Sequence, residues 1–221
     1  MGEYTYACSD FKFKKGLVSA TKTSGHTLQI ADGLWLDKKF KAAMMKSIAQ
    51  SELDRKRFVY SDIGFILLQQ VVEAVTGKTL DAYLVSEFYR PMGLEHTLFQ
   101  PLNRYKKADI MPTAANDYLR RQDLCGYVYD EAAAFMGGVS GNAGLFSTAQ
   151  ELGKIYQMIL NEGELDGKRY LRPETCRIFT TEKSAVSHRG LGYDKPNLKD
   201  PKANACASSA PASVYLSLIH I

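Results

Sequence analysis

A tyrosine and a carboxylate stand two residues apart at the start of the most apolar helical segment of this 221-residue chain. They are Tyr60 and Asp62, and Ser61 separates them. A phenol has an ordinary pKa of about 10, so it can accept a proton near neutral pH only where neighbouring cations stabilise the phenolate. Taken alone, Tyr60 is more simply interpreted as an aromatic side chain that packs beside a helix cap supplied by Ser61 or Asp62.

Residues 137–144, with four glycines in eight positions, are the second feature of chemical interest. Glycine lets the backbone approach a ligand closely, although the same composition also suits a permissive turn. Metal chemistry is not expected, because the four cysteines are far apart and the four histidines show no metal-ligand spacing. We therefore predict no metal and no cofactor.

Composition excludes several classes of protein. Hydrophobic residues make up 45% of the chain and charged residues 24%, which is ordinary for a globular domain. The net charge of +4 is mild, and the lysine pairs are dispersed among acidic residues, so no nucleic-acid partner is expected. No apolar run approaches the roughly 20 residues that cross a bilayer, so no transmembrane segment is predicted. The first residues show no signal-peptide pattern.

Hydrophobic spacing and turn signals indicate the elements that would position these residues. Asp32 and Gly33, flanked by apolar residues, predict a hairpin. The segment 63–76 is expected to form a largely buried helix that ends at Gly77. Further helices are expected over 37–50, from Thr79 to just before Pro91, from two overlapping capping boxes at 147–151 through Leu160, and from Pro173 onward.

Four blocks resemble, in order, a known family. Residues 58–77 are similar to the segment in which a Tyr-x-Asn motif opens a buried helix in class C β-lactamases and related esterases, which are penicillin-recognising serine hydrolases. Residues 90–97 resemble that family's turn, 137–148 its glycine-rich loop and 188–194 its following strand. The likeness spans about residues 53–213. It implies an α+β fold of the β-lactamase/transpeptidase type, here a helix-rich fragment that lacks most of the antiparallel sheet.

The resemblance also implies acyl transfer through a serine ester. The serine of a Ser-x-x-Lys motif attacks a carbonyl, and a lysine and a tyrosine handle its proton. Tyr60 would be the proton carrier, and Asp62 occupies the place of the asparagine. A carboxylate can accept from lysine but cannot donate to a carbonyl oxygen, which disfavours β-lactam hydrolysis more than ester hydrolysis. Gly138, Val139 and Asn142 would line the substrate cleft.

The nucleophile is not identified. Ser9 to Lys12 and Ser19 to Lys22 match Ser-x-x-Lys, but about one match is expected by chance, and both lie in polar, lysine-rich sequence. The family's third motif is Lys-Thr-Gly or His-Thr-Gly, and it would follow residues 207–215. Residues 216–221, which stand there in this chain, do not match it. We therefore expect 1–215 to be a partial domain truncated at both ends, 216–221 to be a non-native tail, and this chain alone to be inactive.

Two functions follow from the resemblance. The first is a serine hydrolase that, when complete, acts on an ester, an amide or a β-lactam of a small-molecule or cell-wall-derived substrate. The second is a catalytically inactive binding or accessory module that keeps the fold, of the kind that is sometimes fused to a cell-wall glycosidase. Relatives of this kind are typically exported, so a periplasmic or exported location is expected from the resemblance.

Overall fold

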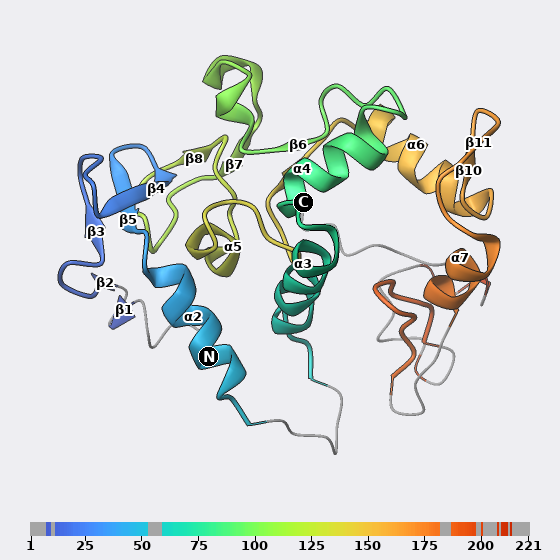
Figure 1. The fold of residues 1–221 in the computed structure, drawn as a ribbon, viewed down its shortest axis with the longest axis horizontal. Helices are drawn as coiled ribbons and strands as arrows, with labels where there is room; N and C mark the ends of the chain where they lie inside the picture. The colour runs from blue at the N-terminus through green and yellow to red at the C-terminus, as the bar shows by residue number, and fades with distance from the viewer. Residues whose placement is uncertain are drawn as a thin grey trace. The chain divides into compact units, whose positions relative to one another are not determined.

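The computed structural model describes residues 8–9, 12–52, 59–181, 187–197, 200, 207, 209–211 and 213 (Figure 1). The chain divides into two compact units, which are described here one at a time. The first unit comprises Met1–Leu53 and Ser61–Glu151, and the second comprises Asp54–Tyr60 and Leu152–Ile221.

The first unit contains a three-stranded antiparallel sheet with the order β3-β5-β4. The predicted hairpin is confirmed, because β4 and β5 are joined by the turn at Asp32 and Gly33, where Gly33 has a φ of 60°. A positive φ is accessible to glycine at little cost, which explains the residue at this turn. The strands are β3 (Val18–Ser19), β4 (His26–Ala31) and β5 (Leu34–Asp37).

Short helices and strand pairs complete the first unit. The helices are α2 (Phe40–Ala49), α3 (Ile63–Thr76), α4 (Leu80–Leu84), α5 (Glu131–Phe135), the π-helix η1 (Val85–Tyr89) and the 3₁₀ turns η2 (Pro101–Asn103) and η3 (Lys107–Asp109). The strand pairs are β1 (Cys8–Ser9) with β2 (Lys12–Phe13), β6 (Leu98–Phe99) with β9 (Leu145–Phe146), and β7 (Pro112–Ala114) with β8 (Leu124–Cys125).

The predicted helices form. The helix α3 ends at Gly77, which has a φ of 67° and whose N–H donates to the Glu73 carbonyl at 3.0 Å. The helix α6 (Ala149–Leu160) continues from the first unit into the second, which also holds β10 (Glu164–Leu165), β11 (Lys168–Arg169) and α7 (Pro173–Thr180). In the part of the chain that the structure describes, no helix is long and apolar enough to cross a membrane.

The hydrophobic core of the first unit gathers side chains from the sheet, α2, α3 and α5. Phe135 of α5 contacts the ring of Phe40 edge to face, with 5.2 Å between the ring centroids. Leu36 and Ile66 are completely buried against this cluster. The core therefore fixes α5, and with it the glycine loop that follows, against the sheet and α3.

The expectation that α3 is largely buried was wrong. Only Ile66 and Gln69 of this helix are buried, whereas Val75 is 81% exposed. One narrow face meets the core and the glycine loop, and five apolar side chains on the rest of the helix are exposed. The exposed ones are Phe65, Leu67, Leu68, Val71 and Val75.

A buried ion pair organises the long connection between β7 and α5. Arg120 and Asp117 have fully buried side chains, and the guanidinium donates to both carboxylate oxygens, at 2.9 and 3.0 Å. Arg120 also donates to the carbonyls of Val128 and Tyr129. The pKa of the Asp117 carboxyl lies below its ordinary value: burial alone raises it, but the bonds and charge of Arg120 outweigh burial.

The capping boxes at the start of α6 form only in part. Thr148 caps the helix through a bond from the Glu151 N–H to its hydroxyl at 3.3 Å. The Glu151 carboxylate does not return to the cap. It accepts instead from the backbone N–H groups of Glu95 and His96, at 2.8 and 3.0 Å, and from the Thr97 hydroxyl at 2.6 Å. The sequence pattern predicted the start of the helix correctly. The Glu151 carboxylate, however, accepts hydrogen bonds from the distant segment 95–97 and not from the cap residue.

The α+β fold class is confirmed, since helices alternate with small antiparallel sheets and the longest described strand has six residues. The strand expected over 188–194 does not form. This segment is irregular, and the N–H of Gly190 donates to the Tyr193 carbonyl at 2.9 Å. Gly192 has a φ of 91°, a turn conformation that interrupts an extended strand.

Candidate functional site

The start of α3 places Ser61 and Asp62 in different roles. The Ser61 hydroxyl accepts from the Ile63 N–H at 3.3 Å, so the serine provides the side-chain contact to the first turn. Asp62 is the N-cap residue, but its carboxylate makes no capping bond and its side chain is half-buried. Of the two capping candidates, the serine is the one whose side chain contacts the first turn of the helix.

Tyr60 belongs to the second unit, and its side chain is 47% exposed. The guanidinium carbon of Arg189 lies 5.4 Å from the centre of the Tyr60 ring. A cation at this distance from the face of an aromatic ring attracts the ring's negative face. The structure therefore supplies a cation beside the predicted proton carrier.

Arg189 is held by a second residue of the same segment. Its NH2 lies 3.3 Å from Oδ2 of Asp194, which is 8% exposed. Oδ1 of Asp194 lies 3.0 Å from Nε2 of His188 and accepts from the Lys195 N–H at 2.9 Å. Each carboxylate oxygen thus has a partner, and the bonds orient Asp194 toward Arg189.

Sequence reasoning did not connect this segment with Tyr60 and assigned it only as a strand. The signal was present, because a histidine, an arginine and an aspartate fall within residues 188–194. Nothing in the sequence pairs them with Tyr60, which lies more than a hundred positions earlier. The contact exists only in the fold.

The glycine loop, residues 137–144, packs directly on α3. A Cβ added to Gly141 would lie 2.1 Å from the Phe65 carbonyl oxygen, so no other residue fits there without movement of the backbone. Nε2 of the buried Gln69 donates to the Val139 carbonyl at 3.3 Å. The loop is therefore attached to the helix that Asp62 begins. The position of Tyr60 relative to the loop stays a prediction, because Tyr60 lies in the other unit.

Asn142, a predicted substrate-binding residue, uses its amide within the protein. Its Nδ2 donates to Asp130 Oδ1 at 2.9 Å, and its Oδ1 accepts from the Ser140 hydroxyl at 2.7 Å. The same Asp130 oxygen caps α5 by accepting from the Ala133 N–H at 2.7 Å. The side chain of Asn142 therefore joins the glycine loop to the start of α5.

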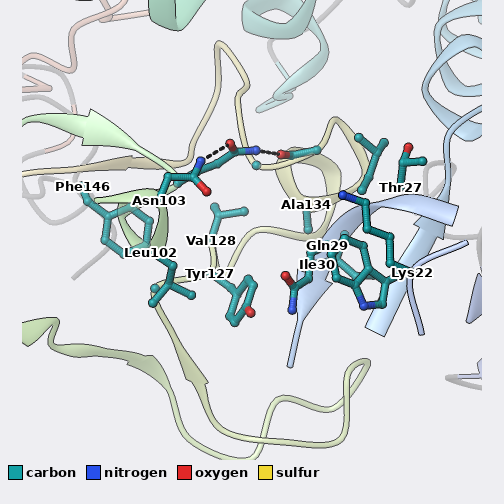
Figure 2. Close-up of a pocket in the computed structure, with 16 residues that line it drawn as sticks. Lys22, Thr27, Gln29, Ile30, Leu102, Asn103, Tyr127, Val128, Ala134 and Phe146 are labelled. Atoms are coloured by element: carbon teal, nitrogen blue, oxygen red, sulfur yellow. Dashed lines mark hydrogen bonds between the residues drawn. The ribbon is translucent and has the colours of Figure 1, made fainter. Parts of the chain in front are cut away.

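Gly138 is the predicted substrate-binding residue that lines a pocket. The pocket has a volume of about 360 Å³ and lies between the β3-β5-β4 sheet, η2 and the start of the glycine loop (Figure 2). Gly138 has a φ of 85°, and a Cβ there would lie 3.4 Å from Gln100. Neither Val139 nor Asn142 is among the lining residues.

Neither Ser-x-x-Lys match lies at the start of a helix. Ser9 is in the two-residue strand β1, and Ser19 is in β3, where it pairs with Trp35. The ammonium of Lys22 lies 5.4 Å from the centre of the Trp35 ring. The structure thus agrees with the interpretation that these matches are coincidental.

We expect Gly141→Ala to destabilise the chain by roughly 1–3 kcal/mol, because the new methyl group would overlap the Phe65 carbonyl. Gly64→Ala is the matched control within α3, since a Cβ there meets nothing within 4 Å. It should stabilise the helix by roughly 0.5–1 kcal/mol. Urea denaturation monitored by circular dichroism measures both. Equal stabilities of the two variants would contradict the packing of the loop on α3.

Several known proteins are similar to this chain in sequence. A protein of Escherichia coli (strain K12), provisionally named a D-alanyl-D-alanine carboxypeptidase, is 38% identical over 149 residues, which cover 62% of this chain and 34% of the relative. The N-acetylmuramyl-L-alanine amidase of Bacillus subtilis (strain 168) is 36% identical over 155 residues, which cover 65% of this chain and 35% of the relative. The chain spans about a third of the length of these relatives.

A solved structure, the octameric penicillin-binding protein homologue from Pyrococcus abyssi, matches with a TM-score of 0.47 and 17% identity, covering 71% of this chain and 35% of that one. A family model described as Beta-lactamase matches residues 20–196. This match includes α3, the glycine loop and the segment 188–194. The chain therefore belongs to the beta-lactamase family.

Proposed function

We propose that the protein containing this chain is a serine hydrolase that cleaves acyl bonds of cell-wall-derived peptides through an acyl-enzyme. The observation that carries the proposal is the placement of the Arg189 guanidinium 5.4 Å from the Tyr60 ring. The names of the relatives, a carboxypeptidase and an amidase, support a cell-wall substrate. Within the family, the segment beginning at Tyr60 favours the branch of class C β-lactamases and esterases.

The proposed role of Tyr60 is to move one proton twice. As the nucleophilic serine attacks the carbonyl carbon, its hydroxyl proton passes to the Tyr60 phenolate, and a tetrahedral oxyanion forms. When that intermediate collapses, the bond to the leaving group breaks and the phenol returns the proton to the leaving nitrogen or oxygen. Water then attacks the acyl-enzyme with the same proton transfers, which releases the acid and restores the serine.

Arg189 and Asp194 are proposed to prepare Tyr60 for this role. The guanidinium stabilises the phenolate that accepts the first proton, and Asp194 holds the guanidinium in place. Asp62 is proposed to accept a hydrogen bond from the catalytic lysine. Because a carboxylate cannot donate to the substrate carbonyl, this residue disfavours β-lactam hydrolysis more than ester hydrolysis. Neither Ser-x-x-Lys match within this chain opens a helix, so the proposal assigns the nucleophile to another part of the protein.

A covalent probe tests the proposal. We expect a fluorophosphonate to label one serine in a longer protein that carries this chain, and prior incubation with an acetyl-D-alanyl-D-alanine thioester to slow the labelling. Peptide mapping by mass spectrometry identifies the serine. A folded longer protein that neither the probe nor the thioester modifies would support the inactive accessory module instead.

A further inference from the structure

Positive charge is concentrated in one part of the first unit. Residues 12–50, from β2 to the end of α2, contain eight lysines, two aspartates and no arginine or glutamate, which gives a net charge of +6. The whole chain carries +4, so the remaining residues together carry −2. A charge asymmetry of this kind indicates a surface that attracts a negatively charged partner.

The fold brings two lysine pairs of this segment to the same groove. Lys14 and Lys15 lie in the turn between β2 and β3, and they line a groove of about 330 Å³ whose other wall is α2. Lys38 and Lys39 directly precede α2 (Figure 1). Lys46 follows Lys39 by seven residues, so the two share one face of the helix. All five of these lysines are exposed.

Hydrogen bonds hold the turn against the start of α2. The Leu17 N–H donates to the Lys14 carbonyl at 3.0 Å, and Gly16 within this turn has a φ of 81°. The Asp37 N–H donates to the Leu17 carbonyl at 2.9 Å, and Nε2 of His26 lies 2.9 Å from the Gly16 carbonyl oxygen. The two walls of the groove are therefore fixed relative to each other.

The charge of these lysines is not neutralised within the described part of the chain. No carboxylate there forms an ion pair with the last four of them, Lys15, Lys38, Lys39 and Lys46. Asp37 also lines the groove, but its Oδ1 accepts from the backbone N–H of Lys39 at 2.8 Å. Five lysines outnumber this one carboxylate, so the surface remains positive.

The floor of the groove is apolar. It is formed by Leu17 of the turn and by Phe40 and Met44 of α2, and the methyl group of Ala43 is exposed beside them. Phe40 and Met44 are also part of the hydrophobic core. An apolar groove edged by ammonium groups is complementary to a molecule that joins a negative head group to an aliphatic chain.

The type of basic residue favours a lipid surface over other anionic partners. Lysine carries a compact charge without the planar fork with which arginine binds individual phosphates, carboxylates and guanine bases. Nucleic-acid bases stack on accessible aromatic rings, whereas the ring that lines this groove, that of Phe40, is buried. Lysines spread over one face are suited to the many mobile phosphates of an anionic membrane.

We propose that this lysine patch, which consists of Lys14, Lys15, Lys38, Lys39 and Lys46, binds the surface of an anionic phospholipid membrane. The ammonium groups contact lipid phosphates, and the groove receives part of one acyl chain. The proposal is independent of the acyl-transfer chemistry, because none of these residues has a part in it.

Sedimentation with vesicles tests the proposal on the 221-residue chain. We expect the chain to sediment with vesicles that mix phosphatidylcholine and phosphatidylglycerol, and to stay in solution with vesicles of phosphatidylcholine alone. Raising the salt concentration from about 0.1 M to about 1 M shortens the Debye length from about 10 Å to about 3 Å. The partition coefficient onto the charged vesicles should then fall at least about tenfold.

The triple variant Lys15→Gln, Lys39→Gln and Lys46→Gln should lower that partition coefficient roughly a hundredfold, because each lysine near an anionic surface contributes about fivefold. The matched control removes the same charge outside the patch and should lower the coefficient no more than about threefold. It carries Lys106→Gln, Lys154→Gln and Lys168→Gln.

A second pair of variants tests the groove without changing the charge. Ala43→Gln places a polar side chain in the groove and should weaken binding about tenfold, the effect of excluding two methylene groups of the acyl chain. Ala42→Gln, at an exposed position of α2 outside the groove, should leave binding unchanged. Circular dichroism checks that every variant is folded.

Equal sedimentation with charged and uncharged vesicles, or equal effects of the two triple variants, would overturn the proposal. Binding to double-stranded DNA or to polyglutamate as tight as to the charged vesicles would also overturn it, in favour of a different anionic partner. Equal binding of Ala43→Gln and Ala42→Gln would exclude the acyl chain from the groove.

Discussion

Replacing Tyr60 by phenylalanine is expected to lower turnover by roughly 10²–10⁴ in an active protein that contains this chain, the usual worth of a general acid/base. The substitution keeps the ring beside Arg189 and removes only the hydroxyl that would carry the proton. Since the Tyr60 side chain is 47% exposed, the free energy of unfolding should change little. Hydrolysis of p-nitrophenyl acetate and of acetyl-D-alanyl-D-alanine measures the effect.

Tyr129 provides the matched control, because its side chain is 48% exposed. Tyr129→Phe removes the hydroxyl of a tyrosine of similar overall exposure that has no proposed part in the reaction, so turnover should stay near that of the unmodified protein. Near-normal turnover in Tyr60→Phe would restrict Tyr60 to a packing role. The chain would still belong to the beta-lactamase family, but the proposed role of Tyr60 would be wrong.

Removing the carboxylate of Asp117 is expected to cost about 3–5 kcal/mol of stability, the usual result when one partner of a buried ion pair is lost. Asp117→Ala leaves the Arg120 guanidinium without its counter-charge, in a place where its side chain has no exposed surface. The carbonyls of Val128 and Tyr129 would still accept from it, but they carry no net charge. Urea denaturation compares the free energies of unfolding.

Glu164→Ala is the control for that measurement. Its carboxylate pairs with Arg169 at 2.9 Å, but both side chains are nearly half exposed, and a surface pair contributes under about 1 kcal/mol. A loss in Asp117→Ala no larger than in Glu164→Ala would contradict the importance of the buried pair.

The same pair gives a pH dependence with a defined sign. The pKa of the Asp117 carboxyl is lower in the folded chain than its ordinary value of about 3.9. A lowered folded pKa means that the contribution to stability is complete above the unfolded pKa and is lost as the pH falls through the folded pKa. The difference in stability between the native chain and Asp117→Ala should therefore be constant above about pH 5 and shrink at lower pH.

Local signals predicted the elements that depend on neighbouring residues. The turn at Asp32 and Gly33, the end of α3 at Gly77 and the start of α7 at Pro173 each follow from the chemistry of one or two residues. The five-residue helix α5 was not predicted, because it is too short to show a period. Its start depends on Asp130, a cap that also receives the Asn142 amide.

The candidate site was less accessible to sequence reasoning, because its contacts join distant positions. Tyr60 and Asp62 were found through a motif, but Arg189 came from a segment whose role beside Tyr60 only the fold reveals. Asn142 was chosen for its place in the glycine loop, yet its amide holds the loop to α5. The burial of α3 was overestimated from its composition. An apolar side chain can be buried, but its type does not show whether another element packs on it.

The Glu151 carboxylate also bears on the order in which the chain folds. Its bonds to Glu95, His96 and Thr97 span 54 to 56 positions of sequence, so they form only after a long loop has closed, whereas the Asp117–Arg120 pair spans three. Contacts of high sequence separation slow folding because the loop entropy is lost before the contact is gained. We therefore expect the 90–97 turn to join α6 late in folding, after the connection around Arg120 has formed.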